Sequence, residues 1–158
     1  MTNKITIRKA TLVDVPLLLE NWKKLMRLNA QVHRIYRLKK KHTDFYPPFI
    51  RKILKTRKAV VFIAEIDGKC AGHILVELKT LPKCYVIKLE AYISELFVKK
   101  EYRRKGIATR LLAEAEKWGK KKHAAQFGLT VNVQNKNAQA CYSKFGLQVQ
   151  RFKMIKEI

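Results

Sequence analysis

The sequence predicts an α/β fold with a mixed central sheet, in one domain spanning residues 1–158. Residues 59–65 form an apolar run that the turn dipeptide Asp67-Gly68 joins to a second run, residues 70–78, as in a β-hairpin. Residues 106–123 indicate a helix with one apolar face, formed by Ile107, Leu111, Leu112, Ala115 and Trp118. No repeat or Gly/Ser-rich linker divides the chain.

The N-terminal third predicts one strand and two helices. Ile5 and Ile7 alternate with polar neighbours, as in a strand. Thr11 and Asp14 have the spacing of a capping box and begin a helix that we expect to reach about residue 29. Pro47-Pro48 begin a second, shorter helix to about residue 56, because proline is tolerated in a first helical turn.

The C-terminal half predicts further strands and helices in alternation. A strand ends at Phe97-Val98, and another covers residues 127–133. A helix over residues 136–144 ends at Gly146. We expect a last strand over residues 147–155, which gives the order β-α-α-β-β-β-α-β-α-β.

The chain is strongly basic, with 35 Lys and Arg against 12 Asp and Glu, a net charge of +23. Residues 1–58 alone carry 16 basic and 3 acidic side chains, a net charge of +13. Such a field attracts polyanions, namely nucleic acid, acidic protein surfaces or phosphate-bearing molecules. The alternative interpretation is a lysine-rich, solvated surface without a dedicated partner.

Other features favour a cytoplasmic location. No apolar run approaches the length of a membrane span, and the first residues lack the apolar segment of a secretory signal. The three cysteines, at positions 70, 84 and 141, are widely spaced, which favours free thiols in a reducing compartment. Neither cysteines nor histidines have metal-ligand spacing, so we expect no metal.

Residues 95–109 run from a strand through a basic turn into a helix. The first turn of a helix has about four backbone N–H groups without partners and a partial positive charge, so it binds phosphate oxygens. Gly106 permits close approach of the main chain, and Arg103, Arg104 and Lys105 add positive charge. This pattern predicts a diphosphate site, although a turn with a solvated basic rim explains it too.

This turn, Arg103-Arg104-Lys105-Gly106-Ile107-Ala108, resembles the Arg/Gln-x-x-Gly-x-Gly/Ala signature of the GNAT superfamily of N-acetyltransferases. A second block, residues 135–147, is similar to the family's Asn-x-x-Ala-x-x-x-Tyr-x-x-x-Gly-Phe, with Leu147 in place of Phe. The resemblance implies a GNAT-like mixed, mostly antiparallel sheet with a splayed pair of strands and about four flanking helices. It also implies acetyl-CoA as the co-substrate.

By this resemblance, backbone groups of Leu96, Phe97 and Val98 would pair with the pantetheine arm as an added strand would. The amides from Arg104 to Thr109 would hold the diphosphate. The resemblance also implies cofactor contacts from the helix that follows residue 135. The candidate residues are Asn135, Asn137 and Lys144. Asn135 is equally explained as a helix N-cap, and Lys144 as a cation that complements the helix dipole.

The resemblance also implies direct attack of an amine on acetyl-CoA in a ternary complex. Tyr142 matches the family's general acid, and its alternative role is packing against the sheet. Glu95 is the best candidate for the general base, with Ser94 and Glu90 nearby, and its alternative role is a structural ion pair. A backbone N–H near Val98 would stabilise the oxyanion. Cys141 has no His/Asp pattern that would support a nucleophile.

The acceptor cannot be read from these motifs. The resemblance implies that the first two helices and their connection wall the acceptor site, and the charge of +13 on this segment favours a neutral or anionic amine over a polyamine. The rival hypothesis is a basic module that binds RNA or acidic proteins on a GNAT-like fold, with weak or lost catalysis. No stacking series of aromatic residues accompanies the basic residues, which favours the enzyme. A homodimer is suggested only by what is usual in the family.

Overall fold

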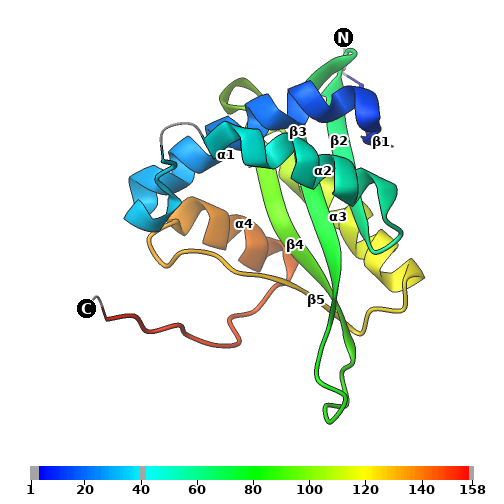
Figure 1. Cartoon of the computed structure of the whole chain (residues 1–158), viewed down its shortest axis with the longest axis vertical. Helices are drawn as coiled ribbons and strands as arrows, with labels where there is room; N and C mark the ends of the chain where they lie inside the picture. The colour runs from blue at the N-terminus through cyan, green and yellow to red at the C-terminus, as the bar shows by residue number, and fades with distance from the viewer. Residues whose placement is uncertain (1–3, 40–41, 157–158) are drawn as a thin grey trace.

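The computed structural model describes residues 4–39 and 42–156 as a five-stranded sheet between two pairs of helices (Figure 1). The strands are β1 (Ile5–Lys9), β2 (Ala59–Ile66), β3 (Lys69–Thr80), β4 (Leu89–Val98) and β5 (Gln126–Leu129). The helices are α1 (Val15–Val32), α2 (Tyr46–Lys55), α3 (Ile107–Lys121) and α4 (Lys136–Phe145). Short 3-10 turns cover residues 12–14, 34–36, 42–45 and 100–102.

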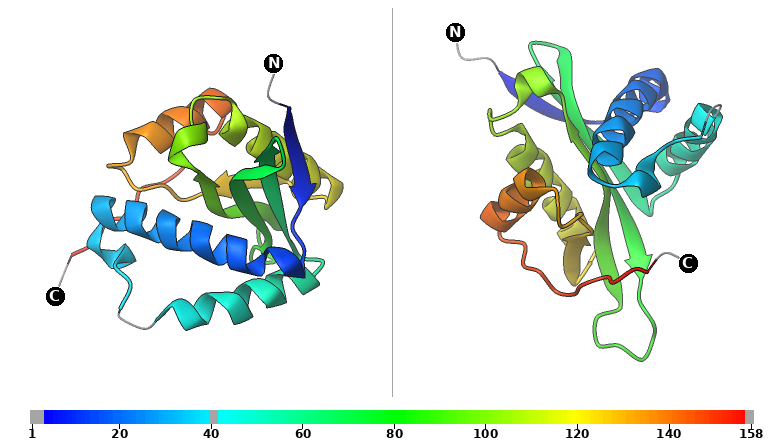
Figure 2. Two further views of the ribbon diagram at one scale, coloured as in Figure 1. Left: turned by 90° about the horizontal axis from the view of Figure 1, so that it is seen from above. Right: turned by 90° about the vertical axis from the view of Figure 1, so that its left-hand side faces the viewer.

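The strands follow one another across the sheet in sequence order, and only the β4–β5 pair is parallel. Helices α1 and α2 cover one face, and α3 and α4 cover the other (Figure 2). The predicted order of elements is confirmed from β1 to α4, as is the mixed, mostly antiparallel sheet.

Strand β2 shows why its sequence is apolar without interruption. Side chains of a strand alternate between the two faces of the sheet. Val61 and Ile63 accordingly pack with α1 and α2, whereas Val60, Phe62 and Ala64 pack with α3. Both faces are covered by helices, so every position of β2 benefits from an apolar residue.

Two sequence-based predictions were wrong at the C-terminal end. The strand expected over residues 127–133 pairs only as β5, Gln126–Leu129, and the strand expected over residues 147–155 has no regular structure. Most of its apolar side chains are exposed, with Phe152 81% and Met154 95% accessible. Alternation of apolar and polar residues predicts a strand only where a sheet edge is available for pairing, and the sequence does not contain that information.

The β4–β5 pair splays apart. Strand β4 pairs with β5 only from Glu90 to Ile93, but its pairing with β3 continues to Val98. The edge of β4 that faces β5 is therefore free from Ser94 onward. The structure confirms the predicted splayed pair and opens one strand edge in the middle of the molecule.

Among the described residues, no helix is both long enough and apolar enough to cross a membrane.

Candidate active site

A β-bulge in β4 sets the orientation of Glu95. Leu75 of β3 is opposite Glu95 and Val76 is opposite Ile93, so Ser94 is an extra residue in β4. Before the bulge, Ala91 and Ile93 face the α3 side of the sheet. One additional residue reverses the alternation, so Glu95 lies on the α1/α2 side. Without the bulge, this carboxylate would point into the apolar layer beneath α3.

Glu95 is almost completely buried and accepts two hydrogen bonds on one oxygen. The Tyr46 hydroxyl donates to Glu95 Oε2 over 2.9 Å, and His73 Nε2 lies 2.9 Å from the same atom. The other histidine nitrogen, Nδ1, is 3.4 Å from the Asn21 side-chain amide. Tyr46 stacks on Trp22 of α1, with ring centroids 4.7 Å apart. Helix α2 thus contacts the carboxylate directly through Tyr46, and α1 supports it indirectly, through Asn21 on His73 of β3 and through Trp22 on Tyr46.

Burial and the neighbouring Glu95 carboxylate raise the pKa of Tyr46 well above its ordinary value. A tyrosine in this state stays protonated and remains a hydrogen-bond donor to the carboxylate at all ordinary pH values. Tyr46, His73 and Asn21 were missed by sequence reasoning. None of them belongs to a recognisable motif, and they come together only because α1, α2 and β3 pack on the same face.

The free edge of β4 leads into the basic turn. Leu96 and Val98 pack on the α3 side, and Phe97 on the α1 side, while their strand edge lacks a β5 partner. Arg103 Nε donates to the carbonyl oxygen of Val98 over 3.1 Å, which ties the turn to the end of β4. The structure therefore places the two predicted cofactor segments next to one another.

The turn ends at Gly106, the N-cap of α3, whose φ of +74° is in the left-handed region. A Cβ added to Gly106 would meet no atom within 4 Å, so the turn faces open space. Ile107 is buried and anchors the helix, whereas the side chains of Arg103, Arg104 and Lys105 are exposed. Within the part of the chain that the structure describes, no acceptor receives the amide hydrogens of residues 104–109. These features fit a diphosphate.

Tyr142 lies in α4 and packs, half-buried, against the layer beneath α3. Burial, and to a lesser degree the neighbouring Cys141, raises its pKa to about 12. The phenol is therefore protonated at neutral pH and can donate a proton. Tyr142 lies on the α3 side of the sheet and Glu95 on the α1/α2 side. Burial also raises the pKa of the Cys141 thiol, which disfavours a thiolate nucleophile.

The remaining predicted residues lie on α4. Asn135 Oδ1 accepts a hydrogen bond from the Ala138 backbone N–H over 3.2 Å, which confirms Asn135 as the N-cap. Asn137 is exposed in the first turn and Lys144 is exposed in the last turn. Contacts of these three residues with a cofactor stay predictions.

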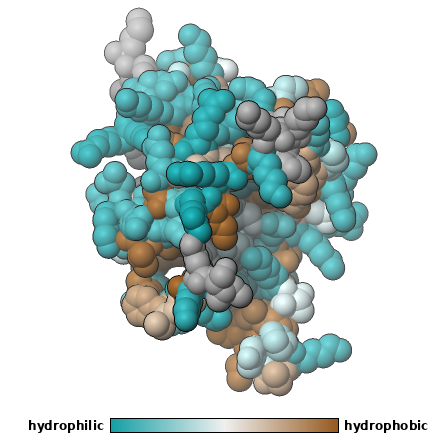
Figure 3. Space-filling model, turned by 60° about the vertical axis from the view of Figure 1, so that its left-hand side comes forward, coloured by the Kyte–Doolittle hydropathy of each residue, from teal (hydrophilic) through white to brown (hydrophobic). Residues whose placement is uncertain are grey.

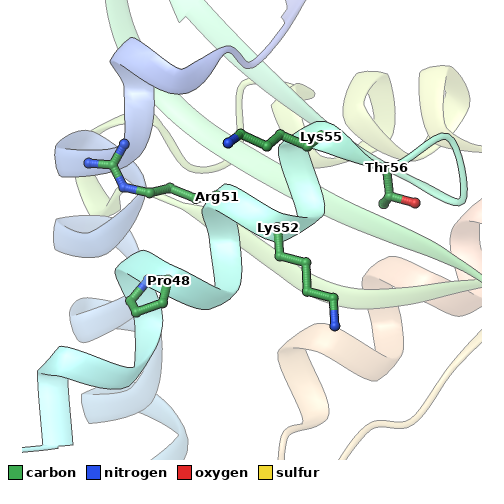
Figure 4. Close-up of a pocket in the computed structure, with 5 residues that line it drawn as sticks. All are labelled: Pro48, Arg51, Lys52, Lys55 and Thr56. Atoms are coloured by element: carbon green, nitrogen blue, oxygen red, sulfur yellow. The ribbon is translucent and has the colours of Figure 1, made fainter.

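The face shown in Figure 3 is hydrophilic over much of its area, with hydrophobic side chains concentrated toward its lower end. One hollow of about 580 Å³ lies over α2 and is lined by Pro48, Arg51, Lys52, Lys55 and Thr56. Figure 4 shows that Arg51 and Lys52 project from opposite sides of the helix. Because Lys52 diverges from Arg51, these two cations do not point toward one bound group.

Comparison with known proteins agrees with this geometry. The profile of the acetyltransferase (GNAT) family matches residues 22–147. An uncharacterized N-acetyltransferase of Methanocaldococcus jannaschii is 30% identical over 144 residues, which cover 90% of this chain and 60% of that protein. An N-alpha-acetyltransferase of Sulfurisphaera tokodaii is 30% identical over 105 residues, 63% of each chain. The chain thus spans about 60% of the length of these curated relatives.

Solved structures share the fold. A predicted acetyltransferase of Clostridium acetobutylicum, determined with acetyl-CoA, has a TM-score of 0.82 at 19% identity, covering 98% of this chain and 96% of that one. A second structure, a mutant protein from Bacillus halodurans, has a TM-score of 0.85 at 20% identity and covers 97% of this chain and 99% of that chain. The family match extends over most of the sequence and includes both motifs, so this chain belongs to the acetyltransferase (GNAT) family.

Proposed function

We propose that this chain is an acetyl-CoA-dependent N-acetyltransferase that acts by direct attack of a primary amine in a ternary complex. One observation carries the proposal: the free edge of β4 begins beside the buried carboxylate of Glu95 and ends at a turn with unpaired amides before α3. A thioester carrier with a diphosphate group fits both ends of this arrangement.

The proposal assigns a separate role to each part of the site. The amides of residues 104–109 bind the diphosphate, and the edge from Leu96 to Val98 aligns the pantetheine arm. Glu95 accepts the proton that the amine loses as its nitrogen bonds to the acetyl carbon. Tyr142 donates a proton to the sulfur as the carbon–sulfur bond breaks. Acetyl-CoA supplies the activated acyl group.

The acceptor that we propose is a neutral or anionic amine. Helices α1 and α2 form the wall beside Glu95, and the first 58 residues, which include both helices, carry a net charge of +13. A polyamine would enter this field against electrostatic repulsion. The relative from S. tokodaii is an N-alpha-acetyltransferase. An α-amine has a pKa of about 8, so it needs less help to become neutral than a lysine with a pKa of about 10.4.

The proposal includes contact of the basic surface with polyanions and a cytoplasmic location. The alternative function is a basic module that binds RNA or acidic proteins and has weak or lost catalysis. It is favoured only by the charge of +23. A homodimer stays a prediction that sedimentation or light scattering can test.

The test begins with a calorimetric titration of acetyl-CoA, followed by an acceptor panel in which thiol release is measured. The panel contains peptides with a free α-amine, neutral amines, spermidine and kanamycin. We expect saturable acetyl-CoA binding and faster turnover of the peptides and neutral amines. Turnover of spermidine or kanamycin at an equal or higher rate would contradict the acceptor assignment. Salt-sensitive RNA binding without acetyl-CoA binding would support the alternative function.

A further inference from the structure

A hollow of about 340 Å³ lies between α1 and the connection from β4 to α3. Its apolar lining consists of Leu28 of α1 and Phe97 of β4. The rest of the lining has a net charge of +4, because it consists of one anion, Glu101, and five cations. The cations are Lys24, Arg27, Lys99, Lys100 and Arg103. We call it the α1/β4 hollow. Two chain segments about 70 residues apart in the sequence form it, unlike the hollow over α2, which one segment forms.

The α1/β4 hollow is adjacent to Glu95 along two separate elements. On β4, Phe97 follows Glu95 by two residues, on the same face and about 7 Å along the strand. The rings of His73 and Phe97 are 6.1 Å apart, and His73 contacts Glu95. On α1, Asn21, Lys24 and Leu28 have the i, i+3, i+7 spacing of one helix face. The residues that contact Glu95 and His73 in the interior therefore adjoin residues that line the α1/β4 hollow.

We propose that the α1/β4 hollow binds a carboxylate or phosphate group of the acceptor while the amine of the same molecule lies at Glu95. This proposal rests on the proposed function. The occupant that fits best is a peptide with a free α-amine and an acidic side chain at its second or third residue. An extended peptide advances about 3.3 Å per residue, so that side chain reaches the distance between Glu95 and the hollow. The apolar floor and the cationic rim match a short aliphatic chain with a terminal anion.

The test compares three proteins: the wild type, Lys24→Glu/Arg27→Glu, and the control Arg51→Glu/Lys52→Glu. Both pairs replace two exposed cations by two anions, so they change the net charge equally. The first pair is confined to α1, so the β4–α3 connection and the amides of residues 104–109 keep their own sequence. The substrates are an Ala-Glu-Glu and an Ala-Ala-Ala peptide of equal length, each with a free α-amine, and kcat/KM is measured with saturating acetyl-CoA.

We expect the wild type to favour the acidic peptide and the Lys24/Arg27 variant to lose at least about tenfold in the ratio of acidic to neutral kcat/KM, mainly through KM. The control should retain the wild-type ratio within about twofold. Equal losses in both variants would overturn the proposal, because the effect would then come from the overall field. An increase in KM for acetyl-CoA alone would also overturn it, since the hollow would then serve a cofactor phosphate.

Failure of the proposed function is distinguishable from failure of this subsite. If the wild type acetylates neither peptide nor any other amine of the acceptor panel, the proposed activity fails, and direct calorimetric binding of the two peptides still tests the hollow. Tighter binding of the acidic peptide that is lost only in the Lys24/Arg27 variant supports the subsite. Turnover of the neutral peptide without preference for the acidic one overturns the subsite and leaves the acetyltransferase proposal in place.

Discussion

His73 Nε2 lies 2.9 Å from Glu95 Oε2, between side chains that are 0% and 8% exposed. The Tyr46 hydroxyl donates to the same oxygen. No hydrogen bond from the described residues reaches Glu95 Oε1. Two contacts on one oxygen fix the carboxylate and leave the second oxygen without a donor among the described residues. This asymmetry supports the base role that we propose for Glu95.

Replacement of Glu95 by Gln keeps the size of the side chain and removes the proton acceptor. We expect kcat to fall about 10²–10⁴-fold, because general-base contributions have this magnitude. Acetyl-CoA affinity should change less than threefold, since the diphosphate and pantetheine segments are intact. The matched control is Glu101→Gln in the β4–α3 connection, assayed with the neutral peptide. A kcat of Glu95→Gln within threefold of the wild type would show that Glu95 is structural.

Replacement of Tyr46 by Phe removes one of the two contacts to Oε2 and leaves His73 in place. We expect kcat to fall about 3–30-fold and the KM for acetyl-CoA to change little, because the carboxylate loses its fixed orientation but not its proton-accepting oxygen. The rate is compared with the melting temperature of each variant. A double variant with Glu95→Gln should be no slower than Glu95→Gln alone. Additive losses would show that Tyr46 acts independently of Glu95.

Replacement of Tyr142 by Phe removes the candidate proton donor and preserves the packed ring. We expect kcat to fall about 10²-fold with acetyl-CoA binding retained. Because burial raises the pKa of Tyr142 to about 12, the phenol keeps its proton between pH 9 and pH 11, where an ordinary tyrosine loses it. The wild-type rate should therefore show no loss from this group below about pH 11. The exposed Tyr85→Phe is the control. An unchanged rate in Tyr142→Phe would exclude the acid role.

Several local elements were predictable from the sequence because their signals are local. The Asp67-Gly68 turn marks the β2–β3 hairpin, and both residues have positive φ. The capping box of Thr11 and Asp14 is present, with the Thr11 N–H donating to Asp14 Oδ2 over 2.7 Å. The glycine at the start of α3 was identified by its position between a strand and a helix. In each case a few adjacent residues specify the backbone conformation.

Features that depend on distant segments were not predictable. The bulge at Ser94 requires the register of β3, and the contacts of Glu95 require α2 and β3. The sequence marked Glu95 as a candidate base but gave no indication that Tyr46 and His73 would hold it. The absent C-terminal strand has the same cause, because pairing needs a partner edge. The guanidinium of Arg8 also contacts both oxygens of Asp14, a contact that the capping-box pattern does not include.

The Arg8–Asp14 pair gives a stability prediction. A hydrogen bond from Arg8, the largest cause, lowers the pKa of Asp14 below its ordinary value of 3.8. A group with a lowered folded-state pKa stabilises the fold above its unfolded pKa, and this contribution is lost as the pH falls through the folded-state pKa. We expect Asp14→Asn to lower the free energy of unfolding by about 2 kcal/mol at pH 7. The difference from the wild type should shrink as the pH falls below about 4.

Urea denaturation at pH 7 and at successively lower pH values measures this effect. Glu20→Gln is the control, since Glu20 forms an exposed pair with Lys23 that contributes at most about 1 kcal/mol. A constant difference between Asp14→Asn and the wild type at all pH values would show that the charge of Asp14 is not the stabilising feature.

The central claim, that acetyl-CoA binds at the amides around Gly106, is tested most directly by calorimetric titration of acetyl-CoA into Gly106→Val and Gly68→Val. Gly68 has a φ of +75° and, as at Gly106, an added Cβ would meet no atom within 4 Å, so backbone strain is matched in the two variants. We predict that Gly106→Val weakens binding at least about 100-fold and that Gly68→Val binds as the wild type does. Equal affinities in the two variants, with both proteins folded, would contradict the account.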